Sequence, residues 1–257
     1  MFRIFKDIIQ SLLKLFNLKI IKINSSFLIN KNELFSFDGN NPNYQLYLDG
    51  LIKSENEKSD NSFKQSRFLD LINLVKFTLN KNEIEDFVEV GCWLGHSSYA
   101  ISYLIKKYSK KKINFHIFDS FEGLSDRSKS DEGLSKFSNY QLLKIRNQFK
   151  SDENFVKNKV LGDFNFVETY KGWVPDKFHI LENKRFSLVH IDVDLYEPTL
   201  DSLKFFFPRL IDGGVIICDD YNSKVFNGAK KACDEYFKDK DFSFSFQPAT
   251  GSFFVIK

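Results

Sequence analysis

The sequence predicts an α/β protein whose mostly parallel, Rossmann-like sheet is closed by a C-terminal antiparallel hairpin. Three observations predict this class. From residue 86 onward, short apolar runs alternate with stretches of helical periodicity, which is the pattern of strands and crossover helices. Several apolar runs end in glycine or aspartate, as strands do at the ligand-binding edge of an open sheet. The tail holds two aromatic runs joined by a turn that Pro248 and Gly251 favour.

The individual elements follow from these periodicities. Helices are expected at 4–16, 63–79, 95–108, 140–149, 199–210 and 228–238, and strands at 86–91, 113–119, 167–172, 186–192, 214–218, 242–246 and 253–256. Pro198 is compatible with its helix because it lies in the first turn. Residues 24–62 are polar with isolated apolar groups, which is typical of a connector or a lid. We therefore expect an N-terminal helical extension at 1–62 and a catalytic domain at 63–257.

Composition and charge exclude several classes of protein. The net charge of +3 is unevenly distributed, because residues 1–32 hold six basic side chains against Asp7 alone. The rest of the chain therefore offers no basic surface of the kind that nucleic acids require. Cys92, Cys218 and Cys233 lack metal-binding spacing and are expected to be buried thiols in a reduced compartment. We expect a cytoplasmic protein, since no apolar run is long enough to span a bilayer and no signal cleavage site is recognised.

The first predicted helix, 4–16, is amphipathic, with apolar residues on one side and Lys6 and Lys14 on the other. Such a helix packs against the main domain or against a second subunit, which would make the protein a homo-oligomer. The alternative is that residues 1–22 rest on an anionic membrane surface, which their positive charge favours. The sequence leaves both interpretations open.

Paired carboxylates end two of the predicted strands, Asp192 with Asp194 and Asp219 with Asp220. Because the carboxyl ends of parallel strands lie at one edge of the sheet, we expect the four side chains to converge. Converging carboxylates repel one another and resist burial, so a hard divalent cation among them is the simplest explanation. For Asp219 and Asp220 alone, a solvated strand end that caps a helix is the alternative.

A glycine turn connects the first strand of the catalytic domain to its helix. The segment Glu89-Val-Gly91-Cys-Trp93-Leu-Gly95-His-Ser97 lies where backbone approaches a ligand and helix N–H groups point outward. Trp93 takes the place of the middle glycine of the dinucleotide-binding fingerprint, so a pyrophosphate would lose its closest approach. A tight turn that binds no ligand is the alternative.

The acid that ends the second strand, Asp119, is placed to accept both hydroxyls of a ribose. A ribose-binding acid without a phosphate-binding glycine loop favours S-adenosylmethionine, a nucleoside that carries a sulfonium and no phosphate. Trp173, which leaves the third strand, would present its indole to the adenine. The alternatives are that Asp119 caps the next turn and that Trp173 is an ordinary core or surface residue.

These segments together resemble the macrocin O-methyltransferase family, whose members methylate sugar hydroxyls on antibiotics. The resemblance covers about residues 63 to 257 and rests on five motifs in register: Phe87-Val-Glu-Val-Gly-Cys-Trp-Leu-Gly-His-Ser97, Phe118-Asp-Ser-Phe-Glu-Gly-Leu124, Lys171-Gly-Trp173, Val189-His-Ile-Asp-Val-Asp-Leu-Tyr196 and Gly213-Gly-Val-Ile-Ile-Cys-Asp-Asp-Tyr221. It implies the fold of class I methyltransferases, in which the last strand of the sheet runs antiparallel to the others.

The resemblance also implies roles for individual residues. Magnesium would be held by Asp192, Asp219 and Asp220, and Asp194 would be the general base. S-adenosylmethionine would lie against Glu89, Gly91, Gly95, Ser97, Asp119, Ser120 and Trp173, and a small-molecule hydroxyl, on a sugar, would be the acceptor. Val193 and His96 depart from the glycines common in relatives at those positions, which would reshape the pocket.

Three other functions are compatible with parts of the pattern. A metal-dependent O-methyltransferase of a catechol-like phenol needs the same carboxylates and the same cofactor site. A non-catalytic nucleoside-binding or membrane-docked scaffold is favoured by the basic N-terminus but disfavoured by four retained carboxylates. A nicotinamide oxidoreductase is disfavoured by Trp93. His190 and His116 lie within apolar runs and are interpreted as strand residues rather than catalysts.

Overall fold

The structure, a computed structural model, describes residues 18–23, 25–30 and 41–257, and the predicted helix at 4–16 lies outside them. The chain divides into two compact units, Met1–Leu48 and Asp49–Lys257. In the first unit, β1 (Leu18–Ile23) pairs antiparallel with β2 (Ser25–Asn30). Helix α3 (Pro42–Lys53) spans the boundary between the units. Neither the hairpin nor α3 was expected within a polar segment, because the apolar residues there are few and widely spaced.

The second unit contains a seven-stranded sheet, and its class agrees with the prediction. The strand order is β5-β4-β3-β6-β7-β9-β8, and β9 runs antiparallel to both of its neighbours. The strands are β3 (Asp86–Val90), β4 (Phe115–Asp119), β5 (Val167–Lys171), β6 (Phe186–Ile191), β7 (Leu210–Cys218), β8 (Phe244–Phe246) and β9 (Phe253–Ile256). Because β3 pairs with β4 on one side and β6 on the other, the chain order reverses there. Open α/β sheets bind their ligands at such a reversal.

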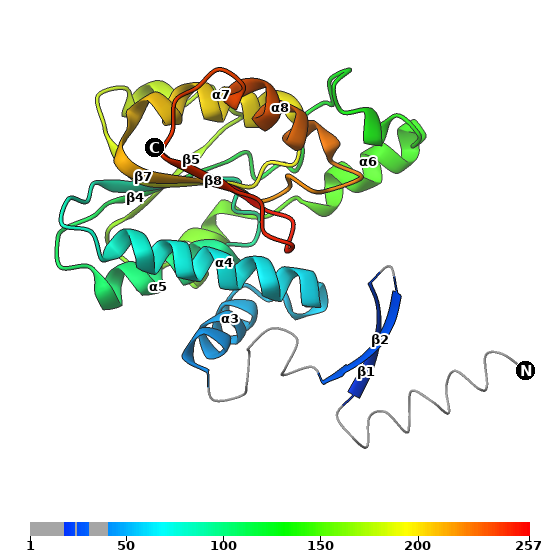
Figure 1. Cartoon of the computed structure of the whole chain (residues 1–257), viewed down its shortest axis with the longest axis horizontal. Coiled ribbons are helices and arrows are strands. Elements are labelled where there is room, and N and C mark those ends of the chain that lie inside the picture. The colour runs from blue at the N-terminus through cyan, green and yellow to red at the C-terminus, as the bar shows by residue number, and fades with distance from the viewer. Residues whose placement is uncertain (1–17, 24, 31–40) are drawn as a thin grey trace, which may run out of the picture. The chain divides into compact units, whose positions relative to one another are not determined.

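Helices cover both faces of the sheet. Helices α4 (Ser62–Leu79) and α5 (His96–Tyr108) lie on one face, and α7 (Tyr196–Phe206) and α8 (Asn227–Phe237) lie on the other (Figure 1). Helix α6 (Asn139–Gln148) begins with a capping box at Ser138. The short helical turns are Glu57–Ser59, Glu132–Leu134, Phe155–Val160, Phe178–Leu181 and Phe207–Arg209.

The boundaries of α7 and β7 differ most from the sequence expectation. Helix α7 starts at Tyr196 rather than 199, and Pro198 still lies in its first turn, where no backbone donor is needed. It ends before Pro208, which instead belongs to a short 3₁₀ turn, and β7 then begins at Leu210 rather than 214. The π-helical turn Phe155–Val160 was not predicted.

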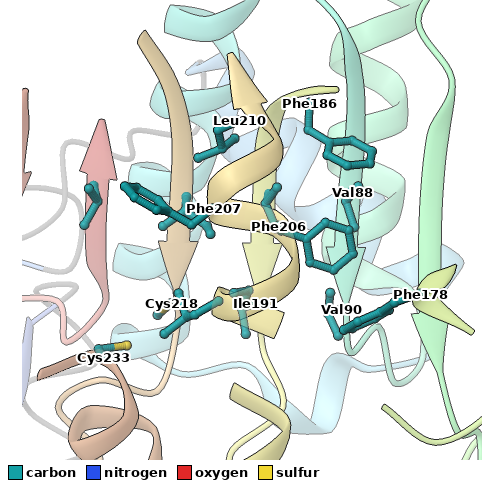
Figure 2. Close-up of a cluster of buried hydrophobic side chains, with 14 of the residues drawn as sticks. Val88, Val90, Phe178, Phe186, Ile191, Phe206, Phe207, Leu210, Cys218 and Cys233 are labelled. Carbon is teal, nitrogen blue, oxygen red and sulfur yellow. The ribbon is translucent and has the colours of Figure 1, made fainter. Parts of the chain in front are cut away.

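The central strands are buried on both faces, as parallel strands between two helix layers must be. Val88, Val90 and Ile191 face α7, where they pack with Phe206 and Phe207 (Figure 2). Successive side chains of a strand point to opposite faces, so the residues between these apolar ones point toward α4 and α5. Those residues are Glu89 and His190, which the register places side by side. The apolar face therefore fixes the strands, while the opposite face carries polar groups toward the sheet edge.

The three cysteines are buried and free, as expected. In the part of the chain that the structure describes, no helix is both long enough and apolar enough to cross a bilayer.

Candidate functional site

A cavity of about 520 Å³ lies at the carboxyl edge of the sheet. The register explains why four strands contribute to it. Val90 pairs with Phe118 and with Ile191, and Ile191 pairs with Cys218, so the four strands end at the same level. The residues that follow these ends all line the cavity, and they are Gly91, Asp119, Asp192 and Asp219.

Four carboxylates line one side of this cavity, and we call them the carboxylate cluster: Asp192, Asp194, Asp219 and Asp220. The structure thus brings together the four acids that the sequence singled out. Asp194 adopts the left-handed backbone conformation, with a φ of 62°, immediately before α7 begins. This conformation is uncommon for a residue other than glycine, and it turns the chain sharply between β6 and α7.

A cation that the sequence reasoning missed pairs with this cluster. Arg67 on α4 places its Nη1 3.1 Å from Asp219 Oδ2 and 3.6 Å from Asp220 Oδ1. Although burial alone raises the pKa of Asp219, Arg67 and then His190 outweigh it and lower that pKa to about 2. Asp219 in turn is the main cause of the raised pKa of Arg67. Helix α4 therefore supplies part of the positive charge for which the sequence analysis considered a divalent cation, and the cation itself stays a prediction.

The remaining acids of the cluster are short of positive partners. Burial, followed by the charge of Asp219, raises the pKa of Asp192 to about 6. Burial and then the charge of Asp220 raise the pKa of Asp194. Burial and then the charge of Asp192 raise the pKa of Asp220. Lys64, one helical turn before Arg67, lines the same cavity, and burial lowers its pKa to about 8. The site is thus a desolvated set of mutually interacting charges.

Glu89 and His190 form a buried pair beneath the cluster. Glu89 Oε1 lies 2.9 Å from His190 Nδ1, and Glu89 Oε2 accepts a hydrogen bond from Ser98. His190 Nε2 lies 3.7 Å from Asp219 Oδ1. Burial alone lowers the pKa of His190, but Asp219 and Glu89 together raise it to about 10. His190 is a strand residue, as predicted, and it also points at the cluster.

Three residues that the resemblance assigned to the cofactor do not line the large cavity. Glu89 is fully buried, Gly95 caps the start of α5, and Ser97 lines a separate pocket of about 70 Å³. Their contact with a cofactor therefore stays a prediction. Gly91 does line the large cavity, and a Cβ atom there would lie 2.0 Å from the carbonyl oxygen of Asp192. This glycine is needed because two strand ends approach each other closely.

Asp119 caps a turn, as the alternative interpretation predicted, and it also lines the cavity in which a ribose is expected. Its Oδ2 accepts hydrogen bonds from the amides of Cys92 and Trp93, at 2.7 and 2.9 Å, and its Oδ1 accepts one from Phe121 at 2.7 Å. It thus fixes the glycine turn and caps its own turn while still lining the cavity. Burial raises its pKa against the effect of these three amides.

Ser120 and Trp173 also line the cavity. The Ser120 hydroxyl donates to the carbonyl oxygen of Gly123 at 2.8 Å, so it shapes the turn after β4. The guanidinium of Arg146 lies 5.5 Å from the centre of the Trp173 ring. An indole held in this way is a suitable surface for a nucleobase.

The geometry is accompanied by a match to a known family. The sequence model of the macrocin O-methyltransferase (TylF) family matches residues 63–247. The chain belongs to this family. The match includes β3 to β7 and therefore contains Gly91, Asp119 and the carboxylate cluster.

Individual curated relatives share only moderate sequence identity with this member of the macrocin O-methyltransferase family. It is 30% identical over 140 residues to the 8-demethyl-8-(2,3-dimethoxy-alpha-L-rhamnosyl)-tetracenomycin-C 4'-O-methyltransferase of Streptomyces olivaceus, which covers 53% of this chain and 52% of the relative. The chain spans between 52% and 62% of the length of the curated relatives it matches.

Solved structures show the fold. The O-methyltransferase NovP superposes with a TM-score of 0.63 at 20% identity, covering 83% of this chain and 98% of NovP. An O-methyltransferase from Bacillus cereus in complex with SAH superposes with a TM-score of 0.50 at 16% identity, covering 83% and 91%. The seven-stranded sheet is therefore the class I methyltransferase fold.

Proposed function

We propose that this protein transfers the methyl group of S-adenosylmethionine to a hydroxyl of a sugar, free or attached to a small molecule, with the help of a divalent metal ion. One observation supports this above all: a single cavity joins Gly91, Asp119 and Trp173 to the carboxylate cluster. The first set suits a nucleoside, and the second suits a metal ion and a hydroxyl group. Family membership and the sugar O-methyltransferase named among the relatives favour a sugar as the acceptor.

The charge of the site supports a divalent ion. The cluster carries four negative charges when ionised, whereas Arg67 and Lys64 together carry two positive ones. Glu89 and His190 offset each other, so the carboxylate cluster lacks two positive charges. Buried charge is costly unless it is balanced, and a divalent cation supplies the missing amount.

The donor atoms also fit an ion. Oxygens of Asp192 and Asp219 and a ring nitrogen of His190 lie within 4.8 Å of one another. Among the described residues, neither His190 Nε2 nor Asp220 Oδ2 has a hydrogen-bond partner, although both atoms are buried. We propose that Asp192, Asp219 and Asp220 hold the ion; His190 would replace Asp220 only by giving up the proton with which it offsets Glu89. An all-oxygen set would favour Mg²⁺, and the nitrogen would favour Mn²⁺. The bound ion would make the acceptor hydroxyl more acidic.

The protein side chains then have distinct tasks. Asp119 and Trp173 would hold the nucleoside so that the methyl group on sulfur faces the carboxylate cluster, which is the alignment an in-line displacement requires. Asp194 would accept the proton of the acceptor hydroxyl as the new C–O bond forms and the C–S bond breaks. Burial and then the charge of Asp220 raise the pKa of Asp194, which makes its carboxylate a stronger base.

The test is methyl transfer itself. The protein is incubated with methyl-labelled S-adenosylmethionine and a panel of sugar diols, nucleotide-linked sugars, glycosides and a catechol. We expect label on a sugar hydroxyl, loss of transfer on chelation, and recovery when Mg²⁺ or Mn²⁺ is added back. Asp194→Asn should lose transfer while its affinity for S-adenosylhomocysteine stays within twofold. Transfer that is unaffected by a chelator would reject the metal, and label on the catechol alone would reject the sugar.

A further inference from the structure

A buried aspartate outside the carboxylate cluster is the starting point. Asp131 is 1% exposed, although it lies in the polar loop 124–138 between β4 and α6. Its Oδ2 accepts hydrogen bonds from the amide and the hydroxyl of Ser128, at 2.7 and 2.9 Å. Its Oδ1 accepts one from the amide of Tyr196 at 2.8 Å. A carboxylate with three such bonds is fixed in orientation.

The contact with Tyr196 lies at the start of α7. Leu195, the N-cap residue of this helix, makes no side-chain capping bond, so Asp131 provides the cap from a distant loop. A carboxylate at a helix N-terminus satisfies a free amide and interacts favourably with the helix dipole. Tyr196 is two residues from Asp194, and the turn between them is tight, because the amide of Leu195 lies 2.6 Å from the carbonyl oxygen of Val193. Asp131 therefore holds one end of the turn that carries Asp194.

The left-handed backbone of Asp194 makes this support important. Such a conformation is strained in a residue other than glycine and persists only where its surroundings enforce it. One end of the turn is fixed by β6, through the amide of Asp192 on the carbonyl oxygen of Val90 at 2.8 Å. The other end is fixed by Asp131. Without the second anchor, the turn is free to relax and to move the Asp194 carboxylate.

Helix α8 closes the space around Asp131. A Cβ atom on Gly228 would lie 1.9 Å from Asp131 Oδ1, so only glycine fits there. The amide of Gly133 donates to the side chain of Asn227 at 2.7 Å, which ties the same loop to the start of α8. The loop also lines the large cavity with Leu124 and Ser125. One carboxylate thus connects a cavity-lining loop, the start of α8 and the turn that presents Asp194.

We propose that Asp131 is a positioning residue for Asp194: by capping α7 from the 124–138 loop, it holds the left-handed turn that aims the Asp194 carboxylate into the cavity. This rests on the proposed function, in which Asp194 accepts the proton. It predicts that loss of Asp131 lowers the turnover number and leaves nucleoside binding unchanged, because Asp119 and Trp173 lie elsewhere in the cavity.

The experiment compares Asp131→Ala, Asp131→Asn and Gly228→Ala with wild type. Methyl transfer, affinity for S-adenosylhomocysteine and hydrogen–deuterium exchange of peptides covering 193–199 are measured for each. Glu132→Gln is the matched control, since it removes an adjacent exposed carboxylate whose side chain has no hydrogen bond or ion pair with the residues that the structure describes. We expect Asp131→Ala to reduce kcat about 10- to 100-fold, with affinity within twofold and faster exchange at 193–199. Asp131→Asn keeps an oxygen for Tyr196 and should recover part of kcat.

The outcomes separate this inference from the proposed function. Unchanged exchange at 193–199 in Asp131→Ala overturns the inference, and so does faster exchange with unchanged kcat. If Asp131→Ala does not fold, Gly228→Ala, which displaces the carboxylate without removing it, must show the same loss of kcat and the same faster exchange, or the inference fails. If wild type itself transfers no methyl group, the proposed function fails, while exchange at 193–199 still decides whether Asp131 anchors the turn.

Discussion

Removal of Arg67 tests how the carboxylate cluster is held together. Arg67→Met keeps most of the side-chain volume on α4 but leaves Asp219 and Asp220 without their cation. The side chains of these acids are 13% and 11% exposed, and that of Arg67 is 29% exposed. Breaking a buried ion pair by removing one partner costs about 3–5 kcal/mol, and the partial exposure of Arg67 places this case near about 3 kcal/mol. Arg67→Lys keeps the charge but lacks the planar fork, so it should lose less.

The assay is thermal unfolding with and without Mg²⁺ or Mn²⁺. For a domain of this size, about 3 kcal/mol corresponds to a fall in Tm of about 6–12 °C. The added ion should raise the Tm of Arg67→Met more than that of wild type, because the variant lacks more positive charge. Arg127→Met is the matched control, since Arg127 is exposed, and it should change the stability by less than about 0.5 kcal/mol. A Tm for Arg67→Met within 2 °C of wild type, on the order of the control's effect, would refute the reasoning.

Three further predictions follow from single contacts. Trp173→Leu should weaken S-adenosylhomocysteine binding about tenfold in calorimetry, because base–aromatic stacking contributes about 1–3 kcal/mol, and unchanged affinity would place the adenine elsewhere. Gly91→Ala should cost at least about 2 kcal/mol in chemical denaturation, since its Cβ would lie 2.0 Å from the carbonyl oxygen of Asp192 at a φ of +87°; a cost below about 1 kcal/mol would contradict this. Burial alone raises the pKa of Asp86, but hydrogen bonds, first from His116, outweigh it and lower that pKa below its usual value. The stability this contributes is present above the unfolded pKa of about 4 and is lost as pH falls toward the folded pKa. Asp86→Asn should therefore cost about 2 kcal/mol at pH 7, and its difference from wild type should narrow below pH 4; a difference that is independent of pH would contradict the assignment.

The parallel strands and the carboxylate cluster could be predicted from sequence because both are local signals. A buried parallel strand is a short apolar run, and level strand ends bring the next residues together whatever the intervening chain does. Asp119 was recognised as a strand-end acid for the same reason. Its three amide partners confirm the turn-capping interpretation, while its contact with a ribose stays a prediction.

The residues that were missed depend on contacts between distant segments. Arg67 looked like an ordinary polar residue of an amphipathic helix, and only the rotation of α4 against β7 places it on Asp219. Asp131 lies in a polar loop 65 residues before the amide it caps. Glu89 was assigned to the cofactor from its motif, and that contact stays a prediction, but its hydrogen bonds with Ser98 and His190 were not expected. These contacts are set by the tertiary packing of distant segments, which local sequence patterns do not encode.

The most direct test of the central claim is a titration of Mn²⁺ followed by electron paramagnetic resonance, in wild type and in Asp219→Asn. The site described here predicts one bound ion per chain in wild type and a loss of that binding in the variant, while S-adenosylhomocysteine still binds both. Equal Mn²⁺ binding by the two proteins, or none by wild type, would contradict the claim that these strand ends hold a metal ion.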